Sequence, residues 1–310
     1  MRSLIPAREF SYAMPEDSAC RRAVIHWIEQ ATGKPRLRRL YEDYAKGPAV
    51  EEFFAEAVAR LALTVRVHGG VTGIPKTGPL VIVANHPFGV VDGIVLGYLI
   101  SLVRSDFKIL VHSVLCRLPE LRPHLLPIDF SETPQARDIN LATRKTALQD
   151  LADGKVIAVF PGGGVATAPK PAGRARDPEW KLFVARLIQA GRSDVVPIHF
   201  AGQNSRLFQV ASHVSETLRL SLLFREVVNK IGTEVRAHVG PALAYESLAG
   251  FDDRRAMVEF LRVTTEALAP AGPVRSGGRA SKRHWGGHDA IVSRLALIGG
   301  PQSPKTSFME

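Results

Sequence analysis

Cysteine is scarce in this chain, with only Cys20 and Cys116 among its 310 residues. The two do not form a Cys-x-x-Cys pair, and no cluster of histidines lies near either of them in the sequence. This scarcity argues against a disulfide scaffold and against a zinc site. It is typical of a protein from a reducing compartment.

Long hydrophobic runs are also lacking. The longest nearly apolar run, residues 89–103, contains Asp92 and is shorter than the roughly 20 residues that span a bilayer. Residues 1–30 contain no continuous apolar segment of the kind found in secretory signal peptides. We therefore expect a cytoplasmic protein that is either soluble or attached to a membrane from one side.

Acidic residues are the minority charge, since 30 Asp and Glu stand against 40 Lys and Arg, a formal net charge of +10. A chain this basic is attracted to polyanions, which include nucleic acid, an anionic membrane surface, and phosphorylated or acyl-carrier partners. Aromatic residues make up only 7%, and the sequence contains no recognised nucleic-acid-binding module. We therefore do not expect nucleic acid as a partner.

Short β-rich segments alternate with helical ones along most of the chain. The predicted strands are 65–69, 80–85, 108–112, 125–129, 156–160, 195–200 and 234–240. The predicted helices between them are 92–103, 134–152, 178–190, 214–230 and 252–267, with Pro134 and Pro178 in first turns. This alternation predicts an α/β fold in which a mixed sheet is flanked by helices on both faces.

The pattern divides the chain into three parts. Residues 1–63 form an N-terminal helical segment, with breaks at Gly33-Lys34-Pro35 and at Gly47-Pro48. Residues 64–270 form the α/β domain. Residues 271–310 are rich in Gly, Pro, Ser and Arg, which predicts a disordered, flexible basic tail. This tail is either a basic arm or a segment without a function.

The first segment that contains candidate catalytic residues is VIVANHPFGVVDG, residues 81–93. An apolar strand places His86 at its carboxyl end, where α/β proteins usually carry function. Pro87 ends the strand and Gly89 permits a tight turn, so that the Asp92 carboxylate can reach the imidazole. An Asp on one ring nitrogen leaves the other free as a general base. The alternative is that Asp92 only caps the next helix at an N-cap-like position and His86 packs in a turn; the spacing leaves both open.

The second segment leads from strand 156–160 into Pro161 and three glycines, Gly162, Gly163 and Gly164. Backbone amides in such a loop can hold an anion, although a run of glycines is often only a flexible turn. The loop lacks the Gly-Lys-Ser/Thr ending of a Walker A motif, and no helix clearly follows it as in a dinucleotide-binding fingerprint.

The third segment continues strand 195–200 into the polar turn Gly202-Gln203-Asn204-Ser205. Asn and Ser are common turn and cap residues, so we favour that role over substrate binding.

Taken together, the three segments resemble the lysophospholipid acyltransferase superfamily, the glycerolipid acyltransferases with a His-to-Asp motif. The resemblance is strongest to its bacterial hemolysin-like and lyso-ornithine-lipid acyltransferase branch, whose motifs are represented here by NHPFGVVDG and HFAGQNS. It covers residues 40–265. Three motifs in the same order, each at a strand end, make it specific.

This chain departs from the common family pattern at two positions. The usual Phe-Pro-Glu-Gly is Phe-Pro-Gly-Gly here, so the acidic residue that helps to hold the acceptor is replaced by Gly162. The Arg that usually follows the strand matching 125–129 is also missing, and Arg137 is its nearest replacement. Arg137, Asn140 and Arg144 share one helix face, which either binds a lipid phosphate or carboxylate or, as we favour, is simply solvated.

The resemblance implies an O-acyltransferase of membrane lipid synthesis, similar to 1-acyl-glycerol-3-phosphate or lyso-ornithine-lipid acyltransferases. Its acyl donor would be acyl-CoA or acyl carrier protein, and its acceptor the hydroxyl of a lysolipid. His86 would be the general base and Asp92 its partner, while Arg137 and the amides of Gly162, Gly163 and Gly164 would bind substrate.

No metal or redox cofactor is implied, and neither cysteine is placed as a nucleophile. Because the acceptor is a lipid, we expect peripheral association with the anionic inner face of the cytoplasmic membrane. The alternative is a thioesterase or lipid hydrolase that uses the same His with water.

Overall fold

The structure is a computed structural model, and the described residues fall within one compact unit. It describes residues 18–45, 53–117, 119–129, 131, 133–170 and 173–270. The predicted tail, residues 271–310, and the predicted break at Gly47-Pro48 lie outside the described residues. The predicted division at residue 63 stays a prediction.

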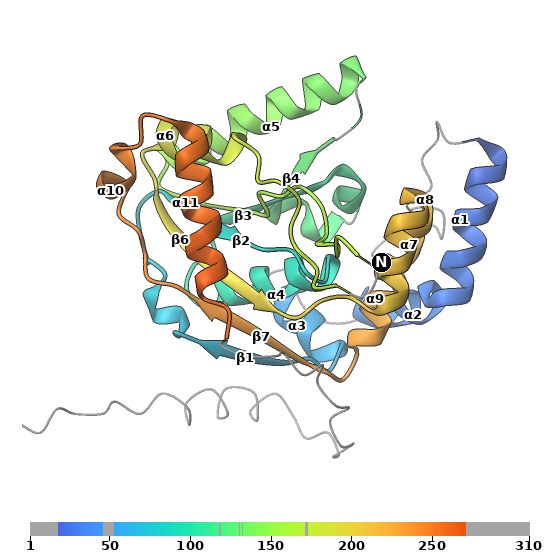
Figure 1. The fold of residues 1–310 in the computed structure, drawn as a ribbon. Coiled ribbons are helices and arrows are strands. Elements are labelled where there is room, and N and C mark those ends of the chain that lie inside the picture. The colour runs from blue at the N-terminus through green and yellow to red at the C-terminus, as the bar shows by residue number, and fades with distance from the viewer. Residues whose placement is uncertain are drawn as a thin grey trace, which may run out of the picture. The chain divides into compact units, whose positions relative to one another are not determined.

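A mixed seven-stranded sheet forms the centre of the described chain (Figure 1). Its strands are β1 Thr64–His68, β2 Leu80–Ala84, β3 Phe107–His112, β4 Leu125–Ile128, β5 Val156–Val159, β6 Asp194–Ala201 and β7 Glu234–Val239. Their order is β1-β7-β6-β2-β5-β3-β4, and every pairing is parallel except that of β6 with β7. All seven predicted strands and the mixed sheet are confirmed.

Helices cover both faces of this sheet. They are α1 Ala19–Thr32, α2 Lys34–Ala45, α3 Phe53–Arg60, α4 Val90–Ser101, α5 Pro134–Ala152, α6 Phe183–Gly191, α7 Arg206–Val214, α8 Glu216–Ser221, α9 Leu223–Lys230, α10 Tyr245–Ala249 and α11 Arg254–Ala267. Short 3₁₀ turns occupy Val71–Gly73, Ser113–Arg117 and Pro119–His124. Among the described residues, no helix has the length and hydropathy needed to cross a membrane.

The strand β2 shows why two helix layers are needed. All five of its residues are buried. Leu80, Ile82 and Ala84 pack on the face that holds α3 and α4, whereas Val81 and Val83 pack on the face that holds α5, α6 and α11 (Figure 1). Successive side chains of a strand point to opposite faces, so a central parallel strand needs apolar residues at every position.

Two predicted helices differ from those observed. The helix predicted from residue 178 begins at Phe183, so the first-turn role predicted for Pro178 is wrong, while that of Pro134 is confirmed. The helix predicted over 214–230 is divided into α8 and α9. Helix α7, over Arg206–Val214, was not predicted; Ser205 caps it by accepting the N–H of Phe208, and the extended backbone of Ser215 (φ −163°) separates it from α8.

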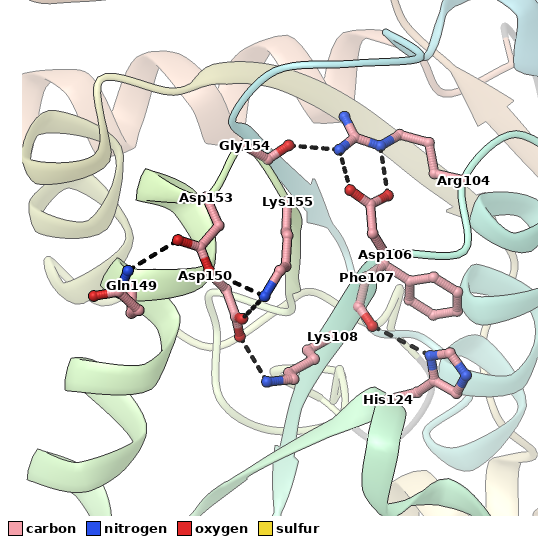
Figure 2. Close-up of polar contacts among 10 residues, drawn as sticks. All are labelled: Arg104, Asp106, Phe107, Lys108, His124, Gln149, Asp150, Asp153, Gly154 and Lys155. Carbon is pink, nitrogen blue, oxygen red and sulfur yellow. Dashed lines mark hydrogen bonds and ion pairs between the residues drawn. The ribbon is translucent and has the colours of Figure 1, made fainter.

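A charged network joins the amino ends of β3 and β5 to the end of α5 (Figure 2). Arg104 donates to both carboxylate oxygens of Asp106, at 2.8 and 2.6 Å, and to the carbonyls of Gly78 and Gly154. The Asp150 carboxylate accepts a hydrogen bond from Nζ of Lys108 at 2.7 Å and another from Nζ of Lys155 at 2.9 Å. The network fixes the loops at the end of the sheet that lies opposite the polar segments predicted to carry function.

Candidate active site

The site begins where β2 ends at the carboxyl edge of the sheet. Asn85, the first residue after the strand, pairs with the backbone of Phe200 in β6: its amide donates to the carbonyl at 2.9 Å, and its oxygen accepts the N–H at 2.6 Å. This side chain therefore continues the ladder between β2 and β6 by one position. The polypeptide is held firmly at the point where His86 leaves the sheet.

His86 and Asp92 meet as predicted. His86 Nδ1 lies 3.1 Å from Asp92 Oδ2, and the Asp92 side chain is fully buried. The same oxygen accepts the backbone N–H groups of Phe88 at 2.7 Å and Gly89 at 3.0 Å. The position of Asp92 in the sequence suggested an N-cap, but the N-cap of α4 is Gly89 (φ 78°). Asp92 lies in the first turn of this helix. One carboxylate thus supports the helix start and orients the imidazole.

The Asp92 carboxylate is incompletely satisfied. Burial raises the pKa of this carboxyl above its usual range, and the contacts with His86, Phe88 and Gly89 offset only part of that rise. Among the described residues, its Oδ1 has no hydrogen-bond partner. The 3.1 Å contact with His86 is short enough for a hydrogen bond but lacks the alignment of one. Catalytic hydrogen bonds are often loose before substrate binds and tighten afterwards.

The second segment lies directly against His86. The imidazole stacks on the ring of Phe160, with centroids 4.0 Å apart and planes inclined by 26°. The His86 carbonyl accepts the N–H of Ala166 at 2.8 Å. The His86 side chain is 18% exposed to solvent, so a small part of a substrate can still reach the imidazole.

The glycine run forms a tight turn. Gly163 has a φ of 69° and donates its N–H to the Phe160 carbonyl at 2.9 Å, so that amide is already used. The backbone N–H groups of Gly162 and Gly164 donate no hydrogen bond to a backbone carbonyl among the described residues. Gly162 is needed for close packing, because a Cβ there would lie 3.2 Å from the Pro178 carbonyl oxygen. Anion binding by this turn stays a prediction.

Sequence reasoning missed Asp177, which approaches the site from the segment between β5 and α6. Asp177 Oδ1 accepts the backbone N–H of His86 at 3.0 Å, and Oδ2 accepts the indole N–H of Trp180 at 3.0 Å. Its Cβ lies beside Gly162, the position at which the resemblance expects an acidic residue. A carboxylate therefore does lie next to this turn. Nothing in the local sequence around Asp177 signals the contact.

Lys230, at the end of α9, was also missed. Its ammonium lies 3.8 Å above the centre of the Phe88 ring. Burial lowers the pKa of this lysine, while the charges of Asp92 and Glu226 act in the opposite direction. Lys230 therefore places a positive charge in the electrostatic field of the buried Asp92 carboxylate.

The third segment supports the site without entering it. Gln203 Oε1 accepts the N–H of Ala175 at 2.9 Å and so holds the segment that carries Asp177. Ser205 caps α7 and donates its hydroxyl to the buried Glu226 at 2.6 Å. Asn204 is 2% exposed, and neither the nitrogen nor the oxygen of its side-chain amide has a hydrogen-bond partner among the residues described. The turn and cap roles favoured from the sequence are confirmed for Ser205.

Arg137 lies in the first turn of α5 and is exposed. This helix follows the edge strand β4, which is three positions from β2 in the sheet. Asn140, on the same predicted face, is occupied by hydrogen bonds to the backbone of Asp129. Arg144 lines a separate hollow between α5, α6 and α11. Substrate binding by Arg137 stays a prediction.

Fold and site together define a class of protein: an α/β protein in which a His contacts a buried carboxylate at the carboxyl end of a central strand, an arrangement suited to general-base chemistry. A family model described as Acyltransferase matches residues 24–271. The chain belongs to this acyltransferase family, which confirms the superfamily predicted from the three segments.

Two characterised relatives carry the name lyso-glycine lipid O-acyltransferase. The chain is 29% identical over 199 residues to that of Phocaeicola vulgatus, covering 64% of this chain and 68% of the relative. It is 36% identical over 151 residues to that of Bacteroides thetaiotaomicron, covering 48% and 53%. The crystal structure of the 1-acyl-sn-glycerophosphate acyltransferase PlsC from Thermotoga maritima aligns with a TM-score of 0.43 at 17% identity, over 79% of this chain and 87% of that one.

Proposed function

We propose that this acyltransferase moves a fatty acyl group from an acyl thioester to the hydroxyl of a lysolipid. The observation that carries the proposal is the 3.1 Å contact between His86 Nδ1 and the fully buried Asp92 carboxylate. Such a pair presents the second ring nitrogen as a base for a hydroxyl proton. The names of the two lyso-glycine lipid O-acyltransferase relatives support a lysolipid acceptor.

The reaction needs no covalent enzyme intermediate. His86 removes the proton of the lysolipid hydroxyl as this oxygen attacks the thioester carbonyl, and Asp92 stabilises the imidazolium that forms. Collapse of the tetrahedral intermediate breaks the carbon–sulfur bond, and the imidazolium returns its proton to the departing thiolate. The products are the diacylated lipid and the free thiol. Burial raises the pKa of Cys116 to about 11, which makes it a poor nucleophile.

The acceptor that we favour is a lysolipid with an amino-acid head group. The relatives act, by name, on lyso-glycine lipid, and the sequence motifs resemble lyso-ornithine-lipid acyltransferases. These two head groups share a carboxylate, whereas 1-acyl-glycerol-3-phosphate presents a phosphate. The amides of Gly162 and Gly164, together with Arg137, are the groups that we assign to the anionic part of a substrate.

The test of this function is an acyl-transfer assay with the full chain. Labelled acyl-CoA and labelled acyl carrier protein are each offered with lyso-glycine lipid, lyso-ornithine lipid or 1-acyl-glycerol-3-phosphate, and His86→Ala is the control. We expect label in the diacylated amino-acid lipid with the wild type only. Release of free fatty acid at the same rate without any acceptor would instead identify a thioesterase.

We also propose that the enzyme binds the membrane from one side. Several large apolar side chains of α1 and α7 are exposed, and both helices pack against α8 (Figure 1). These side chains are Val24 at 42%, Trp27 at 73%, Leu207 at 48%, Val210 at 44% and Val214 at 70% exposure. Exposed apolar groups near an anionic surface combine hydrophobic contact with the attraction of the basic chain.

Sedimentation with vesicles tests this attachment. We expect binding to vesicles of anionic lipid that weakens as salt is raised, because salt screens the attraction. Trp27→Ala should weaken binding, whereas Leu102→Ala, an exposed apolar residue just beyond α4, is the matched control. Equal binding to neutral vesicles at every salt concentration would rule out the electrostatic part.

A further inference from the structure

The segment between β5 and α6 brings a second carboxylate to His86. Asp177 uses both of its oxygens: Oδ1 accepts the main-chain N–H of His86, and Oδ2 accepts the indole N–H of Trp180, each at 3.0 Å. Asp92 contacts the ring of His86. The catalytic residue is therefore held twice, by its side chain and by its backbone, through carboxylates from two distant parts of the chain.

The structure holds Asp177 rigidly in this place. Trp180, its second partner, is 4% exposed and belongs to the core beneath α5 and α6. Lys181 donates its N–H to the Pro161 carbonyl at 2.9 Å, which ties the end of the segment to its start. In Figure 1 this yellow-green segment runs toward α7, where Gln209 accepts the N–H of Ala168 at 2.8 Å.

The buried position of Asp177 disfavours the ionised form of its carboxyl group. Burial raises the pKa of Asp177, and the negative charge of Asp92 adds to that rise; the hydrogen bonds from His86 and Trp180 and the charge of His86 oppose it. Placing two buried carboxylates near one imidazole costs folding free energy. Such costs are concentrated at functional sites, where the groups serve the reaction.

We propose that Asp177 is a positioning residue: its carboxylate fixes the main chain of His86, so that the imidazole keeps its place between Asp92 and the ring of Phe160 while the proton moves. The proposal rests on the proposed function, in which His86 is the general base. A displacement of about 1 Å caused by a change away from the reacting atoms can slow a reaction about 100-fold.

The first test compares turnover in two variants with that of the wild type. Asp177→Ala should lower kcat about 10- to 100-fold and leave KM for the lysolipid within about 3-fold, because positioning affects the reaction step more than binding. Trp180→Phe removes only the second hydrogen bond of Asp177 and keeps the contact with the His86 N–H; as the matched comparison, it should lower kcat less than Asp177→Ala does, by at most about 3-fold. Asp177→Ala with kcat within about 3-fold of wild type would overturn the proposal.

The conservative variant sharpens the result. In Asp177→Asn, the amide oxygen can still accept the His86 N–H, but the NH₂ group then faces the indole N–H of Trp180. The double variant Asp177→Asn/Trp180→Phe removes this opposition between two donors. We expect its kcat to exceed that of Asp177→Asn alone and to approach that of Trp180→Phe. A double variant no faster than Asp177→Ala would contradict a hydrogen-bonding role.

A readout that needs no substrate separates this proposal from the proposed function. Hydrogen exchange of the His86 backbone amide, followed by NMR on the full chain, should accelerate about tenfold or more in Asp177→Ala and much less in Trp180→Phe. Unchanged exchange in Asp177→Ala would overturn the positioning role. If the wild type transfers no acyl group to any lysolipid, the proposed function fails, and the exchange rates still decide whether Asp177 holds His86.

Discussion

The two ends of the sheet carry two polar clusters of opposite character. At the amino end, three cations and three carboxylates pair with one another, and Arg104 alone fills four hydrogen bonds (Figure 2). At the carboxyl end, one Asp92 oxygen has no partner in the part of the chain that the structure describes, and the contact between Asp92 and His86 is not aligned as a hydrogen bond. Strand β5 connects the two, with Lys155 just before it and Phe160 just after it.

Asp106 and Asp153 at the amino end have pKa shifts opposite in direction to those of Asp92 and Asp177 at the carboxyl end. The hydrogen bond from Arg104 lowers the pKa of Asp106, and the hydrogen bonds from Gln149 and Lys155 lower that of Asp153. Burial raises the pKa of both Asp92 and Asp177. The amino-end charges therefore stabilise the fold, whereas those at the carboxyl end are kept despite their cost. That difference supports the proposal that the carboxyl end performs the chemistry.

The largest effect should follow from His86→Ala. Loss of a general base lowers kcat/KM about 10²- to 10⁴-fold. The variant also loses the stacking of the imidazole on Phe160, so Tm should fall modestly while the protein stays folded. The measurement is the acyl-transfer rate together with the thermal unfolding curve. Activity within a few-fold of wild type would remove His86 from the reaction.

Asp92→Asn should be nearly as damaging to activity without harming the fold. The Asn oxygen can still accept the N–H groups of Phe88 and Gly89, and a buried charge is removed, so Tm should stay the same or rise. The imidazole loses its charged partner, and kcat should fall about 10²- to 10⁴-fold. If Tm drops sharply and activity per folded molecule is normal, Asp92 serves only the helix start.

Arg104→Ala should show the reverse pattern. Its side chain is 3% exposed, and its loss leaves two carbonyls and the Asp106 carboxylate without their donor. We expect the free energy of unfolding to fall by about 2–4 kcal/mol, with kcat per folded molecule unchanged. Urea unfolding and the transfer assay check this. A specific loss of kcat would break the contrast between the two ends.

Acid sensitivity should come from β6, outside both clusters. Burial, with a smaller contribution from His238, lowers the pKa of His199 from 6.5 to about 4. Because the unfolded chain binds this proton more readily, stability is present above pH 6.5 and is lost as the pH falls toward 4, by at most about 3 kcal/mol. Unfolding of wild type and His199→Gln at several pH values checks this; equal slopes for both would contradict it.

The smallest effect concerns the glycine turn. Gly163→Ala places a side chain at positive φ and should cost about 1–2 kcal/mol of stability. Gly164→Ala meets only Pro178 Cγ at 3.7 Å, so its fold should be unaffected. If this turn holds an anionic substrate, Gly164→Ala should raise KM a few-fold without changing Tm. An unchanged KM would leave the turn a purely structural element.

Local sequence patterns predicted much of the framework. Each β-rich run became a strand, and helix α5 has the predicted bounds, since Pro134 suits the first turn and Thr133 accepts the N–H of Ala136 as a cap. Prediction failed at 178–182, because Pro178 looks like a helix start although it packs beside Gly162 in a loop. Short-range signals cannot separate these two uses of proline.

What the sequence determined by itself is the meeting of His86 and Asp92. They are six residues apart, and the turn through Pro87 and Gly89 has few ways to fold, so local sterics bring them together. The approach of Asp177 to the His86 backbone, across 91 residues, was decided only by the tertiary structure. That contact depends on β2 and β5 being neighbours in the sheet, and strand order follows from long-range packing that no local pattern encodes.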